Sequence, residues 1–217
     1  NRTGEVLTYV GAADPSGPGG ALDLLRAARQ PGSTLKPFVY ALAFEKRLIT
    51  PASLLDDSPA QIATPSGLYL PQNYDREFKG WVSARTALGA SLNVPAVRVG
   101  AMLGPDALFA RLNAFGLALS ESAGYHGQAL ALGGADVTLL ALTNAYRALA
   151  NGGLASAPLL RGAPALPASP RRVADAAAVH LVADILADNG ARARTFGLAS
   201  VLATRGFAAV KTGTSKD

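Results

Sequence analysis

The chain has 217 residues, of which 49% are hydrophobic and 16% charged, with a formal net charge of +5. This composition excludes an intrinsically disordered chain and is sufficient for one sizeable hydrophobic core. The absence of cysteine excludes disulfides, cysteine-based zinc sites and a cysteine nucleophile, and the scattered basic residues do not favour a nucleic-acid partner. The two histidines, His126 and His180, have no ligand partners at metal-site spacing, so no metal is expected.

The first third of the chain predicts one buried helix between irregular segments. A strand is expected at residues 5–10, before a loop rich in Gly and Pro. Residues 33–48 are apolar on nearly every side, which is typical of a helix in the core, and Pro37 is tolerated in its first turn. Thr50-Pro51 resembles another helix start, and residues 56–80 are expected to be a loop.

The rest of the chain is predicted to be mostly helical. A proline-rich loop is expected at residues 158–170, and a second strand at residues 206–214. Caps and apolar spacing predict five further helices, at residues 83–88, 95–103, 105–115, 136–150 and 175–188.

Three short motifs follow one another in the order S-x-x-K, S-x-N and K-T-G. They are Ser33-Thr34-Leu35-Lys36, Ser91-Leu92-Asn93 and Lys211-Thr212-Gly213. Each motif alone is weak evidence, although K-T-G is rarer by chance than the other two, and each occurs once here, on an expected helix, loop and strand. Together, in this order, they are typical of enzymes that form an acyl-serine intermediate.

The chemistry explains why these residue types occur at this spacing. Ser33 and Lys36 lie three apart on one helix face, and a serine hydroxyl needs a nearby base to become a good nucleophile. Lysine is such a base only if its pKa is lowered, which the apolar surroundings of Lys36 and a second cation, Lys211, would achieve.

The K-T-G segment favours recognition of an extended peptide. Lys211 would attract a terminal carboxylate, while Thr212 and Thr214 add hydroxyls to the strand. Gly213 allows a close backbone approach beside the substrate.

Longer stretches around these motifs resemble the transpeptidase domain of class A, bifunctional penicillin-binding proteins, and within that family the 1C branch. The resemblance covers nearly the whole chain. It rests on residues 29–38, 73–75, 90–96, 132–134, 145–146, 150–153 and 211–217.

The resemblance implies an α/β (α+β) fold of the β-lactamase and D,D-peptidase type. Helices would surround an antiparallel sheet, of which only about two non-adjacent strands are expected here. Residues 1–217 would be one partial transpeptidase domain, truncated at both ends. The glycosyltransferase domain, the membrane anchor and the last sheet strands would lie outside it, so this piece alone is expected to be unstable or inactive.

The resemblance also implies a role for each motif residue. Ser33 would attack the carbonyl between the two terminal D-alanines of a peptidoglycan stem peptide, with Lys36 as general base. Ser91 would relay a proton to the leaving D-alanine, and Asn93 would orient Lys36 and the substrate amide.

Lys211, Thr212 and Thr214 would hold the terminal carboxylate, and the backbone N–H groups of Ser33 and Thr214 would form the oxyanion hole. β-Lactams would acylate Ser33. No metal or organic cofactor and no nucleic acid is implied, and the parent protein would sit on the periplasmic face of the bacterial inner membrane, held only by its N-terminal region.

Three alternatives stay open at this point. A serine β-lactamase shares the fold and motifs but hydrolyses its acyl-enzyme, a penicillin-sensing domain is acylated without turnover, and a structural remnant is not acylated. No glutamate suited to deacylation follows the second motif. Asn73-Tyr74-Asp75 is equally consistent with an Asx-type turn and with a place at the rim of the site.

Overall fold

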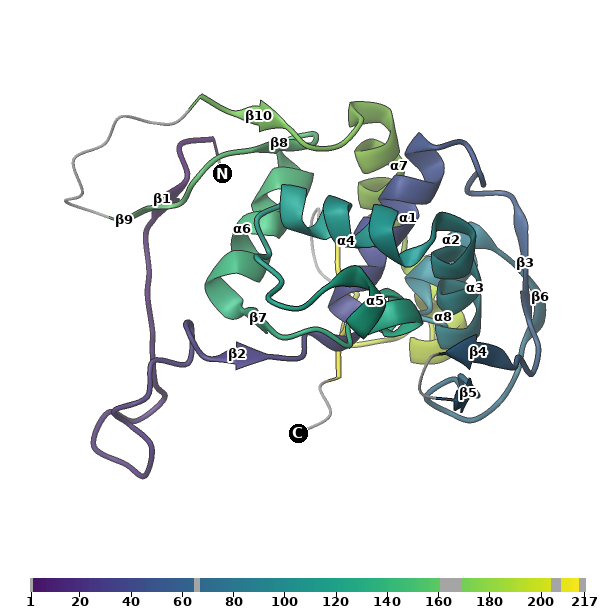
Figure 1. The fold of residues 1–217 in the computed structure, drawn as a ribbon, viewed down its shortest axis with the longest axis horizontal. Helices are drawn as coiled ribbons and strands as arrows, with labels where there is room; N and C mark the ends of the chain where they lie inside the picture. Colours follow the sequence, from purple (N-terminus) through teal and green to yellow (C-terminus); the bar gives the residue numbers. More distant parts are fainter. Residues whose placement is uncertain (1, 65–66, 161–168, 204–207, 215–217) are drawn as a thin grey trace.

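The fold is mainly helical in the computed structural model, which describes residues 2–64, 67–160, 169–203 and 208–214 (Figure 1). The α-helices in these ranges are α1 (Lys36–Glu45), α2 (Ala84–Gly89), α3 (Asn93–Leu103), α4 (Pro105–Ala114), α5 (Ala123–His126), α6 (Leu139–Ala150), α7 (Ala176–Ala187) and α8 (Asn189–Phe196). Two 3-10 helices accompany them, η1 (Gly32–Leu35) directly before α1 and η2 (Gly127–Leu132) directly after α5.

The strands are short and pair two by two. The described strands are β1 (Glu5–Val6), β2 (Ala28–Arg29), β3 (Leu54–Asp57), β4 (Ile62–Thr64), β5 (Gly67–Tyr69), β6 (Gly80–Ser83), β7 (Val137–Thr138), β8 (Leu154–Ala155), β9 (Leu159–Leu160) and β10 (Arg171–Arg172). Only β1 and β9 run parallel; the other four pairs, β2–β7, β3–β6, β4–β5 and β8–β10, are antiparallel.

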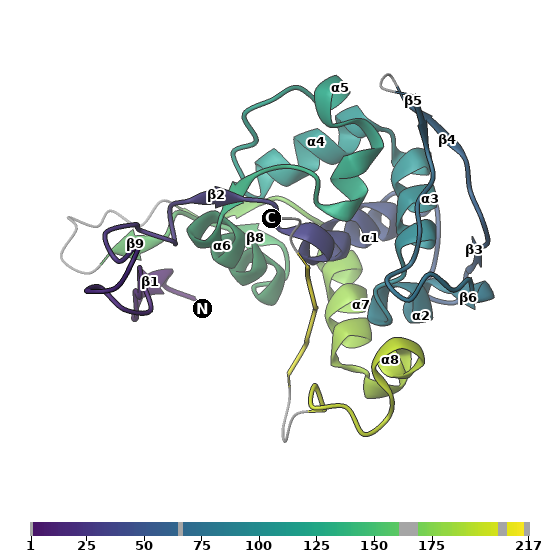
Figure 2. The ribbon, with the colours of Figure 1, turned by 90° about the horizontal axis from the view of Figure 1, so that it is seen from below.

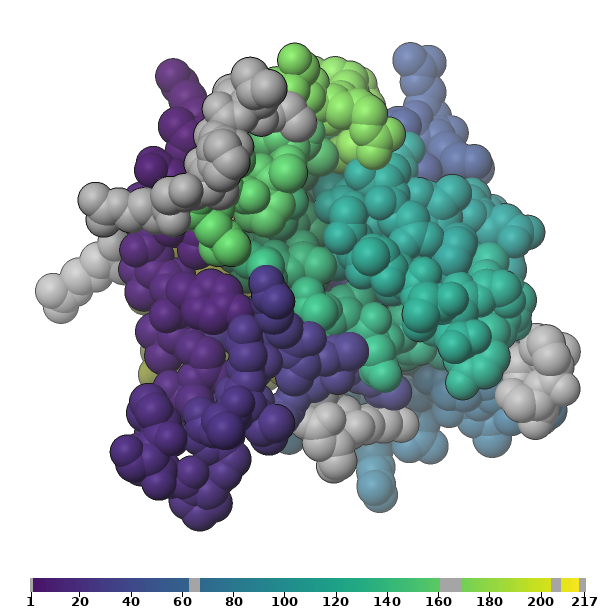
Figure 3. Space-filling view, turned by 60° about the vertical axis from the view of Figure 1, so that its left-hand side comes forward, coloured from purple at the N-terminus to yellow at the C-terminus, as the bar shows by residue number. Residues whose placement is uncertain are grey.

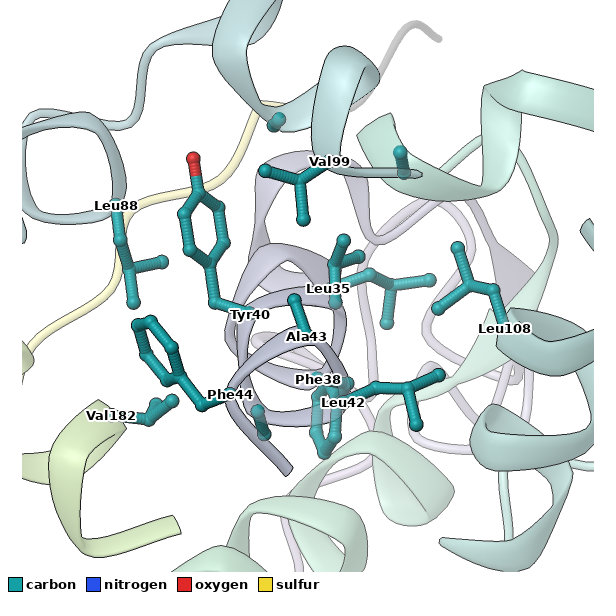
Figure 4. Close-up of a cluster of buried hydrophobic side chains, with 14 of the residues drawn as sticks. Leu35, Phe38, Tyr40, Leu42, Ala43, Phe44, Leu88, Val99, Leu108 and Val182 are labelled. Carbon is teal, nitrogen blue, oxygen red and sulfur yellow. The ribbon is translucent and has the colours of Figure 1, made fainter. Parts of the chain in front are cut away.

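Helix α1 lies at the centre of the core, in contact with α2, α3, α4 and α7 (Figures 1 and 4). Its side chains are buried on every side: Phe38 and Leu42 face one set of neighbours, while Tyr40 and Phe44 face Leu88 and Val182. Each such apolar side chain contributes about 1.5–3 kcal/mol when it is fully buried. The first motif therefore leads directly into a deeply buried helix, with Lys36 as its first residue.

The five other helices predicted from the sequence are all present, with ends set by local caps. Side-chain oxygens of Ser83, Thr138 and Asp175 each accept a backbone N–H from the first turn of α2, α6 and α7, respectively. The central helix ends at Glu45, before residue 48, because Arg47 has a positive φ of 56°. The short elements α5, η2 and α8 were not expected from the sequence.

The expectation that residues 56–80 form a loop is wrong in part. This segment contains β4 and β5 and overlaps β3 and β6, and Thr50-Pro51 begins a turn rather than a helix. In the β3–β6 ladder Asp57 pairs with Gly80, across a long connection. Local composition does not reveal such a pairing, because the two strands are brought together only by tertiary structure.

The two strands expected from the sequence differ from the structure. The first shortens from residues 5–10 to β1, and the N-terminal segment that follows, purple in Figure 3, lies on the outside of the helical body. Of the second, residues 206–207 lie outside the described residues. Residues 208–214 form no ladder, because no described strand lies beside them; Val210 N–H donates to the Leu186 carbonyl at 2.9 Å instead.

Within the described ranges, no helix has the length and hydropathy needed to cross a bilayer.

Candidate active site

Ser33 lies in the tight turn that leads into the central helix. The turn is η1, and 3-10 geometry places residues three apart on the same face, so Ser33 and Lys36 share one side. The Tyr146 hydroxyl of α6 donates to the Thr34 carbonyl at 2.7 Å and ties the turn to α6. Within the described ranges, the half-buried Ser33 hydroxyl makes no hydrogen bond, so it stays available for chemistry.

Lys36 is completely buried, and its ammonium group is directed at the second motif rather than at Ser33. Its Nζ lies 2.6 Å from Asn93 Oδ1, 2.7 Å from the Ser91 carbonyl oxygen and 3.1 Å from the Leu92 carbonyl oxygen. The Ser91 hydroxyl oxygen lies 3.5 Å from the same nitrogen. These contacts hold the Lys36 side chain in one orientation.

Burial is the main reason why the pKa of Lys36 lies well below its usual range. The positive charge of Lys211 lowers the pKa further, and the negative charge of Asp57 opposes both effects. The first two of these causes are the ones expected from the sequence. A general base needs a lone pair, which only the neutral amine has, so the lowered pKa favours the form of Lys36 that such a role requires.

Ser91 and Asn93 belong to the sharp connection between α2 and α3. Ser91 has a positive φ of 61°, which is uncommon for a residue other than glycine and strained unless the surroundings enforce it. This geometry places its hydroxyl oxygen between two amines, 2.7 Å from Lys211 Nζ and 3.5 Å from Lys36 Nζ. A hydroxyl in that position can pass a proton from one nitrogen to another group.

Lys211 is carried by the extended C-terminal segment, which runs past α7 to the start of α1 (yellow in Figure 2). Its Nζ also donates to the Thr212 carbonyl at 2.9 Å. Burial lowers the pKa of Lys211 to about 7. An approaching carboxylate would restore the positive charge, because an opposite charge favours the ionised form.

The K-T-G backbone packs directly on the Ser33 turn. A Cβ built on Gly213 would lie 2.6 Å from Thr34 Cγ2 and 3.0 Å from the Pro31 carbonyl oxygen. A Cβ on Gly32 would lie 3.3 Å from the Thr214 nitrogen and 2.2 Å from the Thr214 carbonyl oxygen. The side on which a Gly213 side chain would project is therefore occupied by the turn itself. Thr214 is exposed and Thr212 half-buried beside it.

Replacing Gly213 with alanine is expected to displace this segment, since the clash involves a backbone oxygen and the Ser33 turn. The acylation of Ser33 by β-lactams that the resemblance implies, followed with benzylpenicillin, should slow about 10-fold or more in this variant, a change of about 1.4 kcal/mol in activation free energy. Gly124→Ala is the matched control, because the nearest atom to its Cβ is 4.0 Å away. Equal acylation rates for the two variants would contradict this account of the contact.

Asp57 and Asn73 also contact the site, and of the two only Asn73 had been considered from the sequence, as one member of a segment with two open interpretations. Both are buried, and Asn73 Oδ1 accepts the backbone N–H of Asn93 at 2.8 Å. Only the open question about Asn73-Tyr74-Asp75 pointed toward them. Asn73 contacts the second motif, whereas Asp75 forms the Asx-type contact, accepting the Glu77 N–H at 3.0 Å, and Tyr74 is exposed.

The structure thus brings the three motifs into one site, joined by Ser91. The S-x-x-K turn, the S-x-N connection and the K-T-G segment meet through the contacts described above. Within the described residues, no group of three or more acidic or histidine side chains is arranged to hold a metal. The hydroxyls of Ser33 and Ser91 and the amines of Lys36 and Lys211 are the kinds of group that acyl transfer through a serine requires.

Comparison with known proteins matches the penicillin binding protein transpeptidase domain family over residues 1–216. Penicillin-binding protein 1C of Escherichia coli K12 is 41% identical over 170 residues, which cover 78% of this chain and 21% of that protein. The crystal structure of penicillin-binding protein 1A from Haemophilus influenzae superposes with a TM-score of 0.66 at 27% identity, covering 78% of this chain and 31% of that one.

A third comparison supports the fold alone. The transpeptidase domain of Burkholderia pseudomallei penicillin-binding protein 3 gives a TM-score of 0.67 at 21% identity, covering 85% of this chain and 58% of that one. The fold class predicted from the sequence is confirmed, as is the resemblance to class A proteins. The chain spans about a fifth of the length of the curated relatives that it matches.

Proposed function

Because this chain belongs to the penicillin-binding protein transpeptidase domain family, we propose that it carries the acyl-serine site of a peptidoglycan D,D-transpeptidase. One observation carries this proposal. The Ser91 hydroxyl lies between Lys36 and Lys211, while Lys36 is buried, held by Asn93 and linked through one helical turn to Ser33.

In the first half-reaction, Ser33 Oγ attacks the carbonyl carbon between the two terminal D-alanines of a stem peptide. Neutral Lys36 accepts the hydroxyl proton, a new carbon–oxygen bond forms, and the carbon–nitrogen bond to the last D-alanine breaks. Ser91 passes a proton to the departing amine, and Asn93 keeps Lys36 and the substrate amide in place.

The K-T-G segment binds the other end of the same substrate. Lys211, with the hydroxyls of Thr212 and Thr214, holds the terminal carboxylate, and Gly213 lets the segment lie against the turn. The backbone N–H groups of Ser33 and Thr214 stabilise the negative oxygen of the tetrahedral intermediate. The packing of Thr214 against Gly32 supports this assignment, since Gly32 directly precedes Ser33 in the turn.

In the second half-reaction, the amine of a neighbouring stem peptide attacks the acyl-serine carbonyl. A new amide bond forms, the bond to Ser33 Oγ breaks, and Ser33 recovers a proton. A β-lactam follows the first half-reaction only, because its ring opens without releasing a leaving group from the site.

The wider setting of the site is also a proposal. The parent protein belongs to the class A branch, carries a peptidoglycan glycosyltransferase domain besides residues 1–217, and acts at the periplasmic face of the bacterial inner membrane. The similarity to penicillin-binding proteins 1C and 1A supports this setting.

Intact-protein mass spectrometry after incubation with benzylpenicillin tests the proposal. The full protein that contains this chain should gain one persistent adduct, which peptide mapping should locate on Ser33, and it should cross-link stem peptides. Rapid release of hydrolysed penicillin would instead indicate a β-lactamase. A stable adduct without cross-linking would indicate a sensor, and a folded protein without any adduct would overturn acylation.

A further inference from the structure

A second buried polar cluster lies directly behind the proposed catalytic site. It is formed by Asp57, the last residue of β3, and Asn73, in the connection between β5 and β6. Asp57 is completely buried and Asn73 is 5% exposed. Asp57 makes no ion pair within the described ranges, and its carboxylate accepts hydrogen bonds from N–H donors of Asn73 and Lys79. Such a charge is costly to bury, and an apolar pair of the same size would often be as stable.

The Asp57 carboxylate fixes which way the Asn73 amide points. Asn73 Nδ2 lies 2.9 Å and 2.8 Å from the two carboxylate oxygens and 2.9 Å from the Glu77 carbonyl oxygen. The Lys79 backbone N–H donates to Asp57 Oδ2 at 2.9 Å. The two Asp57 carboxylate oxygens and the Glu77 carbonyl oxygen can only accept hydrogen bonds, so the NH2 group of the Asn73 amide must face them. The carbonyl oxygen of the same amide therefore points the opposite way.

That carbonyl oxygen takes the place of a missing cap on α3. Leu92, the residue before α3, has no side chain that can cap the helix, and Asn73 Oδ1 accepts the Asn93 N–H at 2.8 Å instead. Asn93 Nδ2 donates to the neighbouring Gln72 carbonyl at 2.7 Å. This leaves Asn93 Oδ1 to face Lys36, which it contacts at 2.6 Å.

We propose that Asp57 and Asn73 are positioning residues for the acylation chemistry. The buried carboxylate orients the Asn73 amide, this amide holds the first turn of α3, and Asn93 and Ser91 thereby present their oxygens to Lys36. The proposal deepens the proposed function and rests on it for its effect on the reaction rate. Neither residue touches the substrate; both act through Asn93 and Lys36.

Asp57 also acts on Lys36 through its charge. The charged groups that act on the amine of Lys36 are Lys211 on the C-terminal segment and Asp57 on β3, and its polar neighbours belong to Ser91, Leu92 and Asn93. Asp57 favours the protonated form of Lys36, whereas burial and Lys211 favour the neutral form. Removing the charge at position 57 therefore shifts the titration of Lys36 to lower pH.

Three variants of the full protein separate orientation from charge. Asp57→Asn removes the charge and puts an amino group where Asn73 and Lys79 both donate, whereas Asn73→Ala removes the amide and keeps the charge. Glu77→Gln is the matched control, because it makes the same carboxylate-to-amide change on an exposed side chain of the same loop. Acylation by benzylpenicillin is followed by stopped-flow and intact mass across pH 5–10, and thermal unfolding is recorded for each variant.

The two positioning variants should each lower the second-order acylation rate about 10-fold or more, while Glu77→Gln stays within about 2-fold of wild type. In Asp57→Asn the acid limb of the pH–rate profile should also move to lower pH by at least about half a unit, and in Asn73→Ala it should not move downward. The proposal would be overturned if both variants had the acylation rate and the pH–rate profile of Glu77→Gln. If Asp57→Asn lost rate but its acid limb stayed at the wild-type pH, Asp57 would have a structural role only.

A measurement independent of acylation keeps the two proposals apart. The NMR titration of the Lys36 side chain, labelled with 13C at lysine Cε and assigned by its absence in Lys36→Arg, reports the same pKa directly. If wild type is never acylated, the proposed function fails, yet the midpoint must still fall in Asp57→Asn. A midpoint equal to that of wild type would overturn the role of Asp57 whatever the outcome of the acylation assay.

Discussion

Replacement of Ser33 by alanine is expected to abolish the benzylpenicillin adduct completely while leaving the fold intact. Alanine has no nucleophilic oxygen, and within the described ranges the Ser33 hydroxyl makes no hydrogen bond whose loss would weaken the turn. The free energy of unfolding should change by less than about 1 kcal/mol. Intact mass after a long incubation, together with urea unfolding of the same samples, measures both quantities.

Ser83→Ala is the matched control for that experiment, and it should behave in the opposite way. The Ser83 hydroxyl caps α2 by accepting the Thr86 N–H at 3.1 Å, so its loss should lower stability by about 0.5–2 kcal/mol. Ser83 lies outside the site, and the adduct should form as in wild type. An adduct of unchanged mass on Ser33→Ala would show that another residue is acylated and would remove the basis of the proposed mechanism.

The sequence predicted those parts of the site that depend on neighbours along the chain. Ser33 and Lys36 share a helix whose all-round apolar pattern predicts deep burial, and burial is the main cause of the lowered Lys36 pKa. The order of the three motifs predicted that Ser91 and Lys211 would join them, and the structure brings these side chains to hydrogen-bonding distance. The chemical roles of the motif residues stay predictions.

The sequence did not predict what depends on pairing across long separations. Asp57 and Asn73 lie in a segment whose Pro, Asp and Gly content is typical of loops, yet Asp57 becomes buried because β3 pairs with β6. A buried carboxylate that bonds an asparagine 16 residues away has no periodic signal. Gly213 was singled out for a close backbone approach, and the structure shows one to Thr34, while its approach to a substrate stays a prediction.

The two amines of the site differ in what surrounds them, and this difference assigns their tasks in the proposed mechanism. Within the described residues, the hydrogen-bond partners of the Lys36 amine are oxygens of neutral groups and the side chain is fully buried, whereas Lys211 lies on the partly open C-terminal segment with a pKa of about 7. In the proposed mechanism a carboxylate binds Lys211 and favours its cationic form, while the deeply buried Lys36, whose pKa burial and Lys211 both lower, is the amine suited to act as the base.

Replacing Lys36 with methionine or with arginine is expected to lower the acylation rate by about 10³-fold or more in both cases. Methionine has a similar length and no base. Arginine keeps a cation and several N–H donors but has no lone pair at any accessible pH. An equal loss of acylation rate in both variants would therefore show that the reaction needs a base at position 36 and not merely a positive charge. Lys46→Met, an exposed lysine just beyond the end of the same helix, should retain the wild-type rate. Substantial acylation by Lys36→Arg would exclude Lys36 as the base.

The same lysine links stability to pH, which gives a test that needs no substrate. Because folding lowers the pKa of Lys36, the unfolded chain binds this proton more tightly than the folded protein does. At pH values below the usual lysine pKa, this difference in proton binding destabilises the folded state. The free energy of unfolding should therefore rise with pH between the lowered pKa of folded Lys36 and about 10.5, by up to about 1.4 kcal/mol per pH unit. Lys211 contributes a similar rise above pH 7. Urea unfolding across pH 6–10 should show a shallower rise in Lys36→Met than in wild type, because one of the two linked protons is gone; identical slopes would mean that Lys36 titrates normally and could not serve as a base at neutral pH.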